Sequence, residues 1–157
     1  ADAYSDVDPD MAISFLQRGL EAKRDYWSKD DLVVFNRVGM LLRRTGRWQE
    51  ATEEYKKALK VVPDNDGLHY NLGLAYAEGK DYESARASML KAMALNPNLP
   101  QKSAVIACNI AEVFFAVNDS MHALPLVRTA LEMEPDNAQA QKLLQEINAK
   151  IGNETKA

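Results

Sequence analysis

The sequence predicts an all-α solenoid, in which short helix pairs stack on one another along the chain. Pro63 and Pro97 lie 34 residues apart, each near the end of an amphipathic stretch, and Pro135 follows a third such stretch. Small residues recur at matching distances before each proline. A repeat of this period is typical of stacked helical repeats. The alternative, a generic helical bundle, would not require these recurrences.

The packing positions align when each proline is counted as position 32 of a unit. Small residues stand at position 8 (Gly39, Gly73, Ala111), position 20 (Ala51, Ala85, Ala123) and position 27 (Ala58, Ala92, Ala130). Large residues stand at position 7 (Val38, Leu72, Ile110), position 11 (Leu42, Tyr76, Phe114) and position 24 (Tyr55, Met89, Val127). This alternation resembles the signature of the tetratricopeptide-repeat (TPR) family. The resemblance implies a right-handed α-solenoid of helix–turn–helix repeats with a capping helix at each end.

The N-terminal segment, residues 1–31, precedes the first repeat. Asp8 and Pro9 are a helix cap and a first helical residue, so we expect a capping helix over about residues 9–24. Tyr26 and Trp27 lie in the connection that follows.

Two full repeats come next, over residues 32–65 and 66–99. Gly46 interrupts the helical pattern of the first repeat and predicts a turn between its two helices. Residues 78–81 have the same role in the second repeat.

The third repeat spans residues 100–137 and is four residues longer than the others, which is about one helical turn. Because Pro100 suits the first turn of a helix, we expect the first helix of this repeat to begin about one turn early, near residues 100–103. Pro125 lies within the second helix and predicts a kink there or a late helix start.

The C-terminal part is expected to form a capping helix followed by a tail. Residues 138–152 carry one apolar stripe among polar residues, which is typical of a helix that covers the end of a solenoid. Gly152 is expected to end this helix, leaving residues 153–157 as a frayed tail.

In the TPR family, the first helix of each repeat lines a concave groove, and the resemblance implies binding residues at matching positions. These candidate groove residues are Asn36, Arg37, Met40, Arg43, Arg44, Tyr70, Asn71, Leu74, Val105, Cys108, Asn109, Glu112 and Phe115. The two asparagines Asn71 and Asn109 occupy equivalent positions, where an amide can hydrogen-bond a peptide backbone. The arginines make one end of the groove basic and suited to a carboxylate. For each residue the alternative is an ordinary solvated side chain.

Chaperone-binding members of the family resemble one another in a carboxylate clamp of basic and asparagine residues. The corresponding positions here hold Asn36, Met40, Asn71, Val105 and Asn109, and only Asn71 matches. The chain is therefore not expected to bind the acidic C-terminus of a cytosolic chaperone.

A narrower resemblance covers residues 34–48 and 66–71, which are similar to TPR segments attached to bacterial response-regulator receiver domains. It implies a signalling adaptor in the bacterial cytoplasm, with the receiver outside these residues. The sequence leaves an export signal or an upstream domain open, because it begins with Ala1 rather than Met.

Composition narrows the class of function. A net charge of −4 without a basic stripe argues against nucleic-acid binding, and no apolar run reaches the roughly 20 residues that cross a bilayer. Cys108 is the single cysteine, which favours a reducing compartment. His69 and His122 have no neighbouring ligand or nucleophile, so no catalytic, metal or cofactor site is predicted. Two functions remain: an adaptor that binds a protein or peptide in the groove, and a self-assembly module that stacks end to end or through Tyr26 and Trp27.

Overall fold

The computed structural model describes residues 8–156, apart from the side chain of Arg24. Residues 1–7 of the predicted N-terminal segment and Ala157 of the predicted tail lie outside the described residues. The described part is built from helices and 3₁₀ turns. The α-helices are α1 (Pro9–Ala22), α2 (Leu32–Arg44), α3 (Trp48–Val61), α4 (Asp66–Glu78), α5 (Tyr82–Leu95), α6 (Ala104–Ala116), α7 (Ser120–Met133) and α8 (Ala138–Glu154). The 3₁₀ turns are η1 (Arg24–Tyr26), η2 (Lys29–Asp31) and η3 (Leu99–Lys102).

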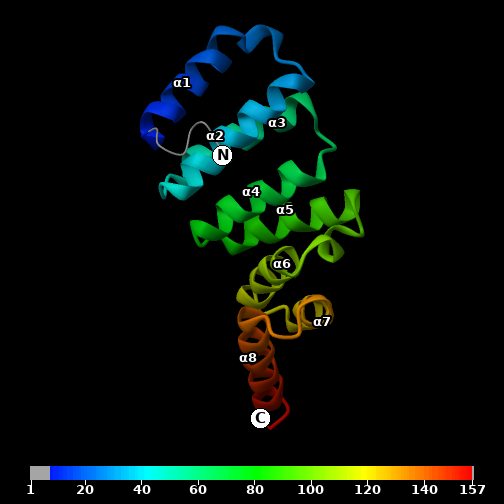
Figure 1. Cartoon of the computed structure of the whole chain (residues 1–157). Helices are drawn as coiled ribbons and strands as arrows, with labels where there is room; N and C mark the ends of the chain where they lie inside the picture. The colour runs from blue at the N-terminus through cyan, green and yellow to red at the C-terminus, as the bar shows by residue number, and fades with distance from the viewer. Residues whose placement is uncertain (1–7, 157) are drawn as a thin grey trace.

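The helices stack in chain order, from α1 at the top of Figure 1 to α8 at the bottom. Each repeat is one antiparallel pair: α2 with α3, α4 with α5, and α6 with α7. Successive pairs pack on one another, α3 against α4 and α5 against α6, while α1 covers α2 and α8 covers α7. The predicted all-α solenoid with a helix at each end is therefore confirmed.

Each pair closes where a small residue of its first helix meets a large residue of its second. A Cβ atom placed on Gly39 would lie 2.4 Å from the ring of Tyr55, and one placed on Gly73 would lie 2.8 Å from Cγ of Met89. The Tyr55 and Met89 side chains are fully buried. Glycine at position 8 therefore lets the helices approach closely, because the space of a side chain is already filled from the opposite helix.

The turn inside each pair has the same backbone geometry in all three repeats. In each turn, the second residue after the end of the helix has a positive φ, which is 77° at Gly46, 61° at Lys80 and 64° at Asn118. The next residue donates its N–H to a carbonyl five residues earlier: Arg47 to Leu42 at 2.8 Å, Asp81 to Tyr76 at 3.0 Å and Asp119 to Phe114 at 2.9 Å. This is the Schellman arrangement, which satisfies the last carbonyl groups of the helix.

Gly79, the glycine of the second turn, does not supply the positive φ there. Its φ is −81°, and the left-handed residue is its neighbour Lys80. A Cβ on Gly79 would instead lie 2.3 Å from the ring of Trp48. Gly79 therefore allows the Trp48 side chain of the first repeat to pack closely against the end of α4.

The first helix of the third repeat is not lengthened, and that prediction is wrong. Residues Leu99–Lys102 form the separate turn η3, in which Leu99 and Pro100 are buried. The helix α6 begins only at Ala104, because Ser103 has an extended backbone and its hydroxyl accepts the N–H of Ile106 at 3.1 Å. An N-cap of this kind fixes the start of a helix.

Two further expectations concern helix ends. Of the two alternatives at Pro125, a kink or a late helix start, the late start does not occur, because Asp119 caps α7 and the helix begins at Ser120. The helix α8 does not end at Gly152 but continues to Glu154, followed by Thr155 as its C-cap. One internal glycine costs a helix only about 1 kcal/mol, which does not terminate it.

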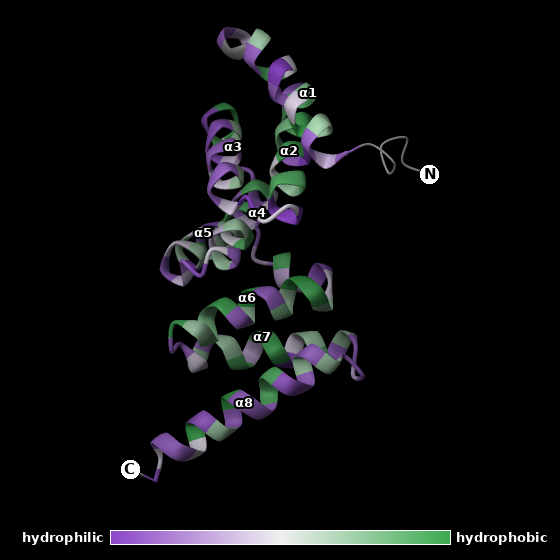
Figure 2. Ribbon diagram, turned by 90° about the vertical axis from the view of Figure 1, so that its left-hand side faces the viewer, coloured by the Kyte–Doolittle hydropathy of each residue, from purple (hydrophilic) through white to green (hydrophobic). Residues whose placement is uncertain are grey.

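Two clusters of buried apolar side chains make up the core. One lies among α1, α2, α3 and α4 and includes Phe35 and Tyr55; the other runs from α4 to α8 and includes Met89 and Phe114. Tyr76 packs against both. Figure 2 shows the difference in composition between the largely apolar α6 and the more polar α3 and α8.

Candidate binding surface on the first helices

Four side-chain contacts connect α2, α4, α6 and α8 in sequence. They are Asn36–Asn71 and Arg43–Glu78 between α2 and α4, Tyr70–Asn109 between α4 and α6, and Glu112–Gln139 between α6 and α8. These four helices therefore lie side by side. We call the surface formed by these residues and their solvent-facing neighbours the first-helix face.

The two equivalent asparagines make equivalent contacts. Asn71 donates its Nδ2–H to Oδ1 of Asn36 at 2.7 Å, and Asn109 donates its Nδ2–H to the Tyr70 hydroxyl at 2.9 Å. In both cases position 6 of one repeat donates to position 5 of the repeat before it. Each asparagine keeps its carbonyl oxygen and one N–H for a further partner.

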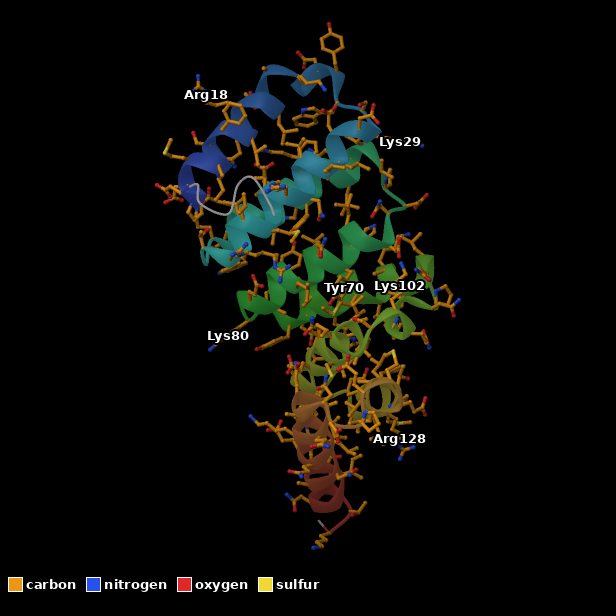
Figure 3. All side chains as sticks on the ribbon, viewed as in Figure 1. Arg18, Lys29, Tyr70, Lys80, Lys102 and Arg128 are labelled. Atoms are coloured by element: carbon orange, nitrogen blue, oxygen red, sulfur yellow. The ribbon has the colours of Figure 1, made fainter. Side chains whose placement is uncertain are left out.

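Tyr70, which Figure 3 labels on α4, is largely buried and contributes its hydroxyl rather than an open aromatic surface. Burial raises the pKa of Tyr70, more than the hydrogen bond from Asn109 lowers it. The phenol therefore stays neutral and available as a hydrogen-bond acceptor at physiological pH.

Arg43 is already paired, so it does not provide the free positive charge expected at this end of the groove. Its Nε and Nη2 both donate to Oε1 of Glu78, at 2.9 and 2.6 Å, and its side chain is 18% exposed. Burial lowers the pKa of Arg43, but the hydrogen bond to Glu78, the charge of that carboxylate and the nearby Tyr55 together outweigh burial, so the pKa is raised overall. Arg37 is half-buried, and Arg44 is the arginine of α2 that is exposed.

The phenol of Tyr55 lies beneath this ion pair. Its ring fills the space beside Gly39, and its hydroxyl is buried without a hydrogen-bond partner of normal geometry. Burial raises the pKa of Tyr55, while the nearby Arg43 guanidinium acts in the opposite direction. In the first repeat, the first-helix face therefore lies directly above a buried aromatic ring.

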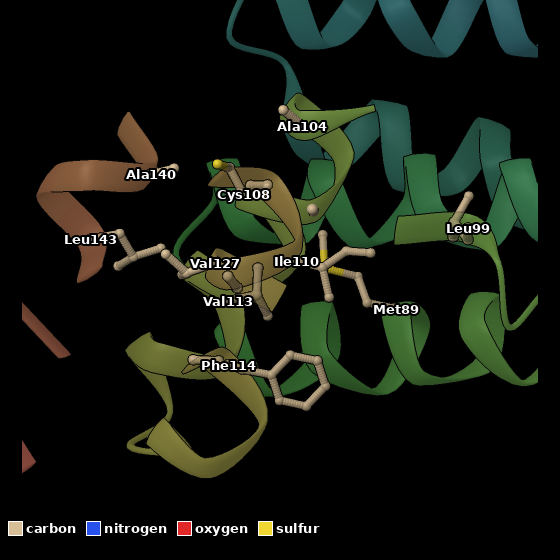
Figure 4. Packing of buried hydrophobic residues seen from close by; sticks show 14 of the residues in the cluster. Met89, Leu99, Ala104, Cys108, Ile110, Val113, Phe114, Val127, Ala140 and Leu143 are labelled. Atoms are coloured by element: carbon tan, nitrogen blue, oxygen red, sulfur yellow. The ribbon is translucent and has the colours of Figure 1, made fainter. Parts of the chain in front are cut away.

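Cys108 does not reach the groove, contrary to the sequence prediction. Its side chain is fully buried between α6 and α8 (Figure 4), and its Sγ lies 3.9 Å from Oδ1 of Asn137, the N-cap of α8. Burial raises the pKa of the thiol, and the charges of Glu112 and Glu134 raise it further. A protonated, covered thiol is a core residue without nucleophilic character.

The apolar part of the first-helix face is smaller than expected. Met40 and Val105 are 48% and 54% exposed, and Phe115 is half-buried. Leu74 packs instead against the second core cluster.

A hollow of about 440 Å³ lies between α6 and α8. Its lining consists of Glu112, Phe115, Ala116, Ala138, Gln139, Lys142, Leu143 and Glu146. Gln139 donates its Nε2–H to Oε1 of Glu112 at 2.7 Å, and Lys142 pairs with Glu146 at 3.8 Å.

Sequence reasoning treated α8 only as a cap and missed its contribution to this surface. A signal was present: Asn137 precedes α8 as Asn65 precedes α4, and both side chains cap their helices. Counted from these caps, Gln139, Lys142 and Glu146 stand at positions 2, 5 and 9, which are groove positions in the repeats.

The described residues do not assemble a metal site, since no group of three or more His, Cys, Asp and Glu side chains is arranged around a common point. His122 stacks on Phe114 and contacts Asp119, and His69 lies 2.8 Å from the carbonyl oxygen of Pro63. Within residues 8–156, no helix has the length and apolar character needed to span a bilayer.

Comparison with known families agrees with this architecture. A model described as TPR repeat matches residues 39–79, and one described as tetratricopeptide repeat matches residues 67–99. The chain belongs to the tetratricopeptide-repeat family. The matches together cover residues 39–99, which are most of the first two repeats, and the third repeat follows the same small–large pattern.

Relatives of this TPR chain have diverse names. Mouse protein O-mannosyl-transferase TMTC3 is 30% identical over 141 residues, which cover 83% of this chain and 15% of the relative. Photosystem I assembly protein Ycf3 of Synechococcus elongatus is 33% identical over 71 residues, 43% of this chain and 41% of the relative. The chain thus spans less than half of either protein.

A solved structure shows the same fold. It is the first TPR domain of Spaghetti (RPAP3) bound to the HSP90 peptide SRMEEVD, which aligns with a TM-score of 0.70 at 24% identity. The alignment covers 80% of the TPR chain and 96% of that domain.

Proposed function

We propose that this chain is a binding scaffold that holds an extended segment of a partner protein on the first-helix face. The repeated asparagine contacts carry the proposal. Asn71 and Asn109 are fixed by neighbouring repeats, and each keeps a donor and an acceptor for the backbone of a ligand. Met40, Val105 and Phe115 add exposed apolar area beside them. Preorganised amides reduce the entropy lost when a peptide binds.

The comparisons support a role in protein binding. The RPAP3 domain is bound to an HSP90 peptide, and Ycf3 is named as an assembly protein. The clamp positions of this chain hold Asn36, Val105 and Asn109 in place of basic residues and Met40 in place of an asparagine, so we propose a partner other than an acidic chaperone tail.

The test begins with peptides selected by this chain from a random display library. Replacing Asn71 and Asn109 with alanine together should weaken binding about tenfold to thirtyfold, because each hydrogen bond contributes about 1 kcal/mol. The matched control is Asn148→Ala, an exposed asparagine of α8 outside the hollow. Calorimetric titration gives the affinities, and thermal unfolding shows whether the variants remain folded. Unchanged affinity in the folded double variant would contradict the proposal.

Self-association is a second candidate function, favoured by Met11 and Phe15 of α1. These side chains are 67% and 73% exposed and lie one turn apart on the helix face that points away from α2. Of the two residues expected to mediate assembly, Tyr26 is 83% exposed, whereas Trp27 packs edge-on against Phe35 at 4.9 Å and donates to the carbonyl of Leu20. Sedimentation velocity decides between the two functions: a dimer that Phe15→Glu dissociates would favour assembly, and a monomer at high concentration would exclude it.

The resemblance of residues 34–48 to receiver-linked repeats extends the proposal to a signalling adaptor in the bacterial cytoplasm. This extension rests on the sequence resemblance alone. Sequencing the region of the gene upstream of Ala1 tests it, since a receiver domain encoded there would support a signalling role and an export signal would oppose it.

A further inference from the structure

The hollow between α6 and α8 has a distinct charge pattern. Glu112 accepts a hydrogen bond from the neutral amide of Gln139, and no cation of the described residues forms an ion pair with it. The other carboxylate of the hollow, Glu146, is paired with Lys142 at 3.8 Å. Glu112 is therefore the charge of this hollow that lacks a counterion.

The rest of the lining is apolar. Phe115, Ala116, Ala138 and Leu143 border the same hollow as Glu112. Lys150 already places its Nζ 5.3 Å from the centre of the Phe115 ring. This ring therefore has an environment that attracts cations, since the face of an aromatic ring is electron-rich.

We infer that the hollow between α6 and α8 binds a lysine or arginine side chain of the partner segment. The aliphatic stem would lie against Phe115 and Leu143, and the charged head would pair with Glu112. Long cationic side chains combine an apolar stem with a charged end, as the two parts of this lining require. An acidic side chain would be repelled by Glu112, and a purely apolar one would leave that carboxylate without a partner.

This inference rests on the proposed function and adds to it the position of one basic residue along the partner segment. Glu112 follows Asn109 by three residues on α6, so the two side chains lie on one side of the helix. A segment whose backbone is held by Asn109 can therefore place a side chain in the hollow. The partner would then carry a basic residue near the part of its chain that crosses α6.

The test uses small probes, so that it does not depend on the true partner. N-acetyl-arginine methylamide and N-acetyl-lysine methylamide are titrated into ¹⁵N-labelled protein, with the norleucine and glutamate analogues as comparisons. The cationic probes should shift the amide signals of residues 112–116 and 138–146 with millimolar affinity. Glu112→Gln should weaken this binding about tenfold, as expected for loss of a charge-assisted hydrogen bond. The matched control Glu53→Gln removes a carboxylate paired with Lys56 on α3 and should leave the binding unchanged.

Equal shifts with the norleucine analogue, or unchanged binding in Glu112→Gln, would overturn the inference. Neither result affects the proposed function, which is judged by the asparagine variants. Conversely, unchanged peptide binding in those variants would contradict the proposed function and would leave this cation site standing as a separate property of the hollow.

Discussion

The first and third repeats share one backbone plan but differ at the two ends of the first-helix face. In the first repeat, Gly39 admits the ring of Tyr55, and the Arg43–Glu78 ion pair closes the surface above it. In the third, the equivalent positions hold Ala111 and the smaller Val127, both buried, and Glu112 borders an open hollow against α8. The difference indicates that the first repeat uses its polar residues for stability, whereas the third leaves a charge available for a ligand.

The largest expected effect is that of Gly39→Ala, because its Cβ would lie 2.4 Å from the buried Tyr55 ring. We expect a loss of about 2–3 kcal/mol in the free energy of unfolding, as for an overpacked core. Combining it with Tyr55→Val, which imitates the third repeat, should cost at least about 1 kcal/mol less than the sum of the single changes. Urea denaturation followed by circular dichroism measures these values.

A matched control is Gly19→Ala in α1, where no atom lies within 4 Å of the added Cβ. This change should raise the free energy of unfolding by about 0.5–1 kcal/mol through helix propensity. Equal effects of the two alanine substitutions would show that Tyr55 does not require a glycine opposite it.

The next effect concerns the ion pair that closes the first repeat. Arg43→Met should lower the free energy of unfolding by about 1–2 kcal/mol, a reduced value because Glu78 is 40% exposed and partly solvated. Arg44→Met, on an exposed neighbour, should change it by less than about 0.5 kcal/mol. Similar losses from both would mean that the pair contributes no more than an ordinary surface charge.

A smaller effect distinguishes the turns of the repeats. Lys80 has a φ of 61°, a conformation that glycine adopts without strain. Lys80→Gly should therefore raise the free energy of unfolding, measured by urea denaturation, by about 1 kcal/mol. Asn118→Gly should gain less, because asparagine tolerates the left-handed region better than lysine does. An equal gain at both positions would show that the side chain does not determine the strain.

The smallest expected effect on stability is at the hollow. Glu112→Gln should change the free energy of unfolding by less than about 0.5 kcal/mol, because Glu112 is exposed and Gln can still accept from Gln139. The contrast with Arg43→Met would place stability at one end of the face and ligand binding at the other. A loss as large as that of Arg43→Met would remove this distinction.

Much of the fold could be predicted from the sequence, because the residues at positions 8 and 24 that pack on each other belong to the same repeat. Gly39 and Tyr55 lie on two consecutive helices, α2 and α3, and the short turn between these helices brings the two residues together. The ends of the helices were harder to predict. The extra residues before α6 suggested a longer helix, but the local hydrogen bond of Ser103 fixed the start.

The candidate surface was predicted only in part. The matching positions of Asn71 and Asn109 were evident, but their partners Asn36 and Tyr70 depend on how far successive helices are offset, which no single repeat encodes. Cys108 was placed wrongly because the capping helix α8 covers it. The hollow was missed for the same reason, since most of its lining residues belong to α8.

The most direct test of the first-helix face is a map of amide chemical shifts on binding a selected peptide. The largest changes should fall on α2, α4, α6 and α8, with α3, α5 and α7 nearly unchanged. Changes concentrated on α3, α5 and α7, or on the exposed Met11 and Phe15 of α1, would contradict the proposal that the first helices form the binding surface.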